Sequence, residues 1–189
     1  MELPEIGPIK EHIPVPREFY SFETGGPFQH CLACQKDLTG DGTLYFVEKA
    51  FQKQEVLFEY AICLNCREEM QKEISEESQE RVNRYFIKEV DLVERRKTLL
   101  DRHRLNHQPW IDRCVLTGKS RESAKQHQIL TLCDGPDMLF SYMPYMLSGE
   151  AMQILNRLLS KKTKDRLDDF VNDFLGLPPE VRDLDLVLL

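Results

Sequence analysis

The 189-residue sequence has no window of about 18 consecutive apolar residues, which excludes a helix able to span a membrane. Its N-terminus lacks the basic region and apolar core of a secretory signal, so a cytoplasmic protein is expected. Positive charge is also scarce, because 25 basic side chains stand against 32 acidic ones and the net charge is −7. This balance argues against a protein that coats nucleic acid with its whole surface. The remaining composition, 41% apolar and 30% charged, is that of an ordinary globular protein of one or two domains.

Proline and glycine are absent between Arg67 and Asn106, where glutamate, glutamine, lysine and arginine predominate. This composition predicts helix in two pieces, the second capped by Ser75 and running over residues 76–106. Apolar residues follow one face of that second helix at spacings of three and four, namely Val82, Phe86, Val90 and Val93. The stripe predicts packing or self-association, so a homodimer through the 76–106 helix is one expected arrangement.

Both ends of the chain have distinctive compositions. Five prolines crowd residues 1–28, which excludes helix there and favours an extended arm. Two interpretations of the arm remain open: a strap that lies on its own protein, or a strand that binds a partner. The tail, residues 183–189, ends in a run of apolar residues and is expected to dock onto the protein.

Two β-hairpins are expected. Aromatic and β-branched residues over 44–62 predict the first, and residues 128–142 predict the second around a turn at 134–137. After the second hairpin, Ser148 is expected to cap a helix over residues 149–175.

The cysteines carry the clearest functional signal. Four of the six form two Cys-x-x-Cys pairs: Cys31 with Cys34, and Cys63 with Cys66. In a chain without an export signal, such pairs are more often metal ligands than disulfides. Two pairs supply the four corners of a tetrahedral zinc site, and four thiolates leave no open position for water. One structural zinc ion is therefore expected, with a redox dithiol or buried free thiols as the alternatives.

A cysteine turn, a hairpin and a helix bearing the second cysteine pair resemble the treble-clef zinc-finger superfamily over residues 29–75. The resemblance implies that Cys31 and Cys34 are the knuckle ligands and that Cys63 and Cys66 are the ligands at the helix start. The expected fold class is α+β. The expected units are an extended arm over 1–28, a four-cysteine finger over 29–75, a long amphipathic helix and linker over 76–110, and a second, metal-free hairpin and helix domain over 111–189.

Two short segments of the first half resemble two segments of the second half. Residues 60–71 align with residues 142–153 at an offset of 82, and residues 31–36 align with residues 114–119 at an offset of 83. This alignment replaces three of the four ligands, setting Thr117, Tyr145 and Ser148 against Cys34, Cys63 and Cys66. It predicts a degenerate second treble clef that has lost its metal. Chance similarity of two short windows is the alternative.

A second metal site is a competing interpretation of the C-terminal half. Its ligands would be Cys114 and Cys133 together with His103, His107 or His127. His103 and His107 lie one helical turn apart, a spacing that allows chelation.

No catalytic constellation is evident, so the expected function is a zinc-stabilised interaction module, an adaptor or regulator that binds a protein. The first alternative is a nucleic-acid-binding component of a ribosomal, transcriptional or repair assembly, with contacts from Arg95, Arg96, Lys97, Arg102 and Arg104. The second is an HNH-like nuclease, because some of those enzymes have a treble-clef core. The hairpin over residues 44–62 contains no histidine to act as a base, which weighs against the nuclease.

Overall fold

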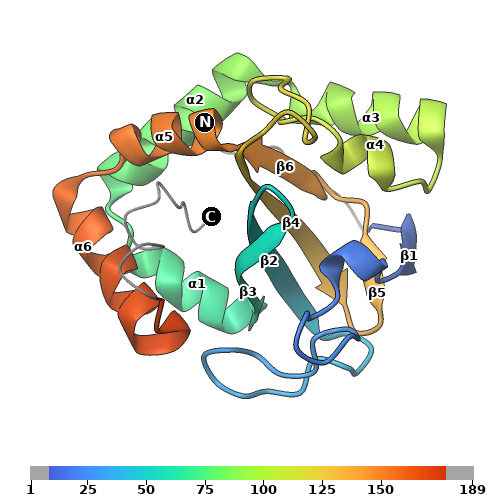
Figure 1. Ribbon diagram of the computed structural model, residues 1–189, viewed down its shortest axis with the longest axis horizontal. Helices are drawn as coiled ribbons and strands as arrows, with labels where there is room; N and C mark the ends of the chain where they lie inside the picture. Colours follow the sequence, from blue (N-terminus) through green and yellow to red (C-terminus); the bar gives the residue numbers. More distant parts are fainter. Residues whose placement is uncertain (1–8, 178–189) are drawn as a thin grey trace.

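The computed structural model describes residues 9–177, which form a mixed α+β fold around one antiparallel sheet. The strand order is β1-β5-β4-β2-β3, and β6 pairs with β4 beside β5. The strands are β1 (His12–Pro14), β2 (Leu44–Gln52), β3 (Glu55–Cys63), β4 (Gln126–Asp134), β5 (Asp137–Leu139) and β6 (Tyr145–Ser148). The helices are α1 (Leu64–Glu73), α2 (Glu76–Glu89), α3 (Leu92–His103), α4 (Gln108–Ile111), α5 (Gly149–Leu158) and α6 (Lys161–Phe170). Figure 1 shows the sheet at the centre, with α1, α2, α5 and α6 in an arc on its left and with α3 and α4 at the upper right.

Both hairpins form where the sequence predicts them, but the sequence does not predict that the two hairpins pair with one another. Strand β2 lies antiparallel to β4 along its whole length, from the pair Leu44–Asp134 to the pair Gln52–Gln126. Segments 29–75 and 111–189, treated above as separate domains, therefore share one sheet in their described parts. Local periodicity carries no information on such a pairing, because its two strands are some 80 residues apart in the chain.

The helix expected over 76–106 is two helices, α2 (Glu76–Glu89) and α3 (Leu92–His103), preceded by α1 (Leu64–Glu73). Ser75 caps α2 as predicted, since its hydroxyl accepts from the Ser78 amide. The prediction of one long helix is wrong because Val90 is extended and the Asp91 carboxylate accepts from the Glu94 amide at 2.9 Å. That hydrogen bond starts a new helix.

The apolar stripe of α2 faces the protein's own interior. Phe86 is buried and its ring lies 6.3 Å from that of Tyr145, while Val82 packs against the same core. The homodimer motivated by this stripe stays a prediction, and it would have to use the apolar side chains that remain exposed on α2 and α3, Ile87 and Val93.

The helix expected over 149–175 is also divided. Ser148 caps α5 (Gly149–Leu158) as predicted, and Ser160 then caps a further helix, α6 (Lys161–Phe170). A π-helical turn follows over Val171–Leu175, and Gly176 ends it with a positive φ of 54°. Residues 183–189, expected to dock, lie outside the described residues.

The described part of the N-terminal arm lies along the sheet. Strand β1 pairs with β5, the Val15 amide donates to the Pro136 carbonyl at 3.0 Å, and Phe19 is fully buried. This arrangement agrees with the strap interpretation for residues 9–28. Within the same described range, 9–177, no helix is both long and apolar enough to cross a membrane.

Candidate metal centre

Two structural elements bring the four cysteines together. Cys31 and Cys34 stand on a tight turn, closed by the hydrogen bond from the Cys31 amide to the Lys36 carbonyl at 2.9 Å. Cys63 ends β3 and occupies the N-cap of α1, and Cys66 lies in the first turn of that helix. The turn is fastened to β3 by the Leu32 amide, which donates to the Ala61 carbonyl at 2.8 Å.

The sulfur geometry matches a single four-coordinate ion. All four Sγ atoms lie within 4.8 Å of one another, and those of Cys34 and Cys63 are 3.7 Å apart. A tetrahedron with metal–sulfur bonds of about 2.3 Å has edges of about 3.8 Å, whereas a disulfide bond is only about 2.05 Å long. All four cysteines are free thiols. They can therefore hold a metal ion at a common centre.

Electrostatics at the site favour a cation. The Cys63 amide donates to the Cys31 sulfur at 3.4 Å. Burial opposes ionisation of Cys31, but the amides of Cys34, Cys63 and Ala33 together lower the pKa of its thiol to about 7. Burial and the neighbouring sulfurs raise the pKa of Cys66 well above its usual range. Four clustered thiolates need a positive charge among them, which a metal ion supplies.

The second half contains a turn with the same backbone hydrogen bond, from the Cys114 amide to the Lys119 carbonyl at 2.8 Å. Here the side chains are different, since Thr117 Oγ1 and Ser148 Oγ are 3.2 Å apart and Cys114 contributes the sulfur. Ser148 caps α5 as Cys63 caps α1. When α5 is compared with α1 from their N-caps, Ser148 matches Cys63 instead of Cys66, and Ala151 matches Cys66.

The competing second metal site does not assemble. Across residues 9–177, the four cysteines of the first half form the one group of three or more ligating side chains close enough to hold an ion. His107 instead lies 3.1 Å from a Glu18 carboxylate oxygen, and His127 accepts a hydrogen bond from Arg121 at 3.2 Å. His103 is exposed, and Cys114 and Cys133 are buried.

His127 makes a testable contribution to stability. The ring is 3% exposed, and burial, with the nearby Arg121 charge, lowers its pKa from 6.5 to about 4. Between these values the unfolded chain binds the extra proton, so the free energy of unfolding should fall by up to about 3 kcal/mol as pH drops through this range. Urea denaturation at several pH values measures the loss. His127→Gln is the control and should show a shallower slope; equal slopes would contradict the prediction.

Two of the five basic residues expected to contact nucleic acid instead bind other parts of the protein. The Arg95 guanidinium lies 5.2 Å from the centre of the Trp110 ring, and burial lowers its pKa to about 10. Arg96 donates to the Phe140 carbonyl at 2.8 Å and pairs with Glu11. The side chains of Lys97, Arg102 and Arg104 are exposed. The sequence shows the basic cluster but not which of its members point inward.

Arg95→Ala should destabilise the protein strongly. The guanidinium donates to three backbone carbonyl oxygens, those of Trp110, Tyr142 and Pro144. Removing these hydrogen bonds and the cation–π contact should cost about 3 kcal/mol, measured by urea denaturation. Lys97→Ala on the same helix should cost less than about 0.5 kcal/mol. Equal effects of the two substitutions would contradict an internal role for Arg95.

No protein family, curated protein or solved structure shows significant similarity to this chain. The fold and site define an α+β protein with a cluster of four cysteines, between a turn and a helix start, that could hold a metal ion.

Proposed function

We propose that Cys31, Cys34, Cys63 and Cys66 bind one structural zinc ion. The observation that carries this proposal is the convergence of four free sulfurs within 4.8 Å of one another. Zinc suits an all-thiolate tetrahedron, and four protein ligands leave no position for a reactive water. The ion would stabilise the fold rather than perform hydrolysis.

We propose further that the finger is a treble clef and that the second half is a copy without metal. Support comes from the matching turns, from the matching N-caps Cys63 and Ser148, and from β4 beginning 82 residues after β2. A metal-free copy must replace binding energy with apolar burial. Large apolar side chains around its helix start are at most 6% exposed: Tyr145, Met146, Leu147 and Met152.

The function we infer is a zinc-stabilised, non-catalytic module that binds a macromolecule, with a protein as the first candidate. A closed metal centre and the absence of histidine from the hairpin over 44–62 both weigh against a nuclease.

Native mass spectrometry of the purified protein tests the metal centre directly. We expect one zinc ion per chain and, after exchange for cobalt, the intense visible absorption of a tetrahedral thiolate site. Two zinc ions would contradict the metal-free second copy. Absence of metal, or a cobalt spectrum of higher coordination, would contradict the closed structural site.

Nucleic-acid binding remains a second candidate because the exposed Lys97, Arg102 and Arg104 lie on or just after α3. Fluorescence anisotropy with a short labelled duplex at low salt measures it. If these residues contact phosphates, neutralising all three should weaken binding and reduce its salt dependence. Absence of binding at low salt would remove this candidate.

A further inference from the structure

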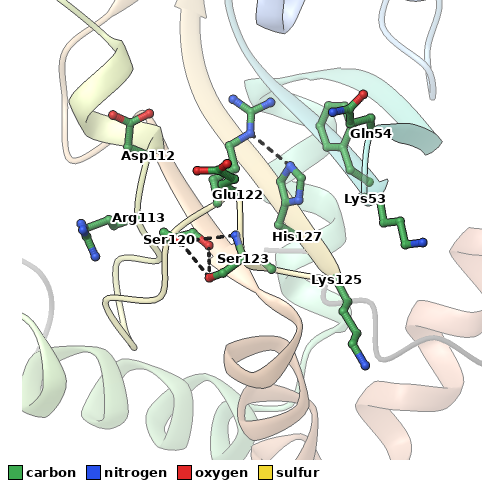
Figure 2. A pocket seen from close by; sticks show the side chains of 12 residues that line it. Lys53, Gln54, Asp112, Arg113, Ser120, Glu122, Ser123, Lys125 and His127 are labelled. Carbon is green, nitrogen blue, oxygen red and sulfur yellow. Dashed lines mark hydrogen bonds between the residues drawn. The ribbon is translucent and has the colours of Figure 1, made fainter.

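A cavity of about 960 Å³ lies away from the cysteine centre, between the tip of the β2–β3 hairpin and the loop that leads into β4. The Lys53 amide donates to the Lys125 carbonyl at 2.8 Å, which joins the two segments at this point. Figure 2 shows the side chains that line the cavity, with His127 near its centre. The volume suits a small organic molecule.

Cationic side chains predominate in this cavity although the whole chain has a net charge of −7. The lining includes four of them, Lys53, Arg113, Arg121 and Lys125, against the two carboxylates of Asp112 and Glu122. In Figure 2 the ammonium groups of Lys53 and Lys125 lie on one side of His127, and both carboxylates lie on the other. Among the residues that the structure describes, none of the four cations forms an ion pair.

Arg121 is held in a fixed orientation. Its Nε donates to His127 Nε2 at 3.2 Å, and its guanidinium lies 5.6 Å from the centre of the Phe51 ring. The Phe51 and His127 rings are stacked, with centroids 4.8 Å apart. Within the described chain, the terminal nitrogens of Arg121 have no protein acceptor. A guanidinium positioned in this way presents parallel donors to an oxyanion.

His127 orients Arg121 from inside the cavity wall. It is 3% exposed, and its Nδ1 has no hydrogen-bond partner among the described residues. Because Nε2 accepts from Arg121, the neutral ring carries its proton on Nδ1. The buried, neutral His127 ring therefore fixes Arg121 Nε in the cavity wall and leaves the two terminal guanidinium nitrogens for a ligand.

We propose that this cavity binds the phosphate group of a small phosphate monoester, with Arg121 as the main contact and with Lys53 and Lys125 contributing charge. A phosphate offers several acceptor oxygens to these donors, and the remaining volume accommodates the organic part. This site is independent of the zinc proposal, because it shares no residue with the cysteine centre.

Isothermal titration calorimetry tests the proposal with inorganic phosphate, a sugar phosphate and a nucleoside monophosphate, each at constant ionic strength. We expect saturable binding of one phosphate per chain, tighter for at least one of the two esters. The double variant Lys53→Gln/Lys125→Gln should bind about tenfold more weakly, and Arg121→Gln should bind more weakly still.

The matched control is Lys88→Gln/Lys162→Gln, which removes the same charge from exposed positions outside the cavity. It should bind as the unmodified protein does. Absence of saturable binding to all three probes would overturn the proposal, and so would an equal loss in the control. Circular dichroism of each variant verifies folding, and the double lysine variant decides the question if Arg121→Gln does not fold.

Discussion

Cys63→Ser is expected to abolish zinc binding and to unfold the protein. Cys63 is both a proposed ligand and the N-cap of α1, at the end of a strand that pairs with β2. A structural zinc site contributes about 10–16 kcal/mol in small zinc domains, which is as large as the total stability of about 5–15 kcal/mol of most folded proteins. Native mass spectrometry should find no zinc, and circular dichroism should show loss of the cooperative thermal transition.

The control for this substitution is Cys133→Ala. Cys133 is also a fully buried free thiol, but it lies on β4 outside the cysteine centre. This variant should keep one zinc ion and lose only about 1–2 kcal/mol of stability. A Cys63→Ser protein that melts like the Cys133→Ala protein would show that no metal stabilises the fold. Chelation of the unmodified protein should reproduce the Cys63→Ser result.

Restoring ligands in the second half should create a second zinc site. The triple variant Thr117→Cys/Ser148→Cys/Ala151→Cys keeps the native Cys114. It would therefore carry four cysteines in the second half, at the positions that match the four cysteines of the first half. The starting geometry is favourable, since Thr117 Oγ1 and Ser148 Oγ are 3.2 Å apart, compared with 3.7 Å for the sulfurs of Cys34 and Cys63. The stoichiometry measured by native mass spectrometry should rise from one zinc ion to two.

The same three substitutions combined with Cys114→Ala provide the control, because they leave three sulfurs instead of four. This protein should bind the second ion much more weakly, as judged by competition with a zinc chelator. A triple variant that folds and still binds one zinc ion would contradict the proposal that the two halves are copies of one metal-binding unit.

Local sequence signals were sufficient for the features that depend on neighbouring residues. The caps Ser75 and Ser148 and the first hairpin are confirmed, since capping and hairpin formation depend on residues close in the chain. The prediction of one helix over 76–106 is wrong, and the reason is also local. The apolar spacing continues through Val90, but Asp91 caps a new helix and so interrupts the first one. Periodicity alone did not reveal that competing signal.

By itself, the sequence determined which four cysteines belong together, because two Cys-x-x-Cys pairs have the spacing of a four-cysteine metal site. Only the tertiary structure decided that β2 and β4 join both halves in one sheet and that Arg95 points inward. It also decided that Arg121 and His127 meet in a cationic cavity. These features arise from contacts between distant segments, and their geometry is set by how whole elements pack rather than by the order of neighbouring residues.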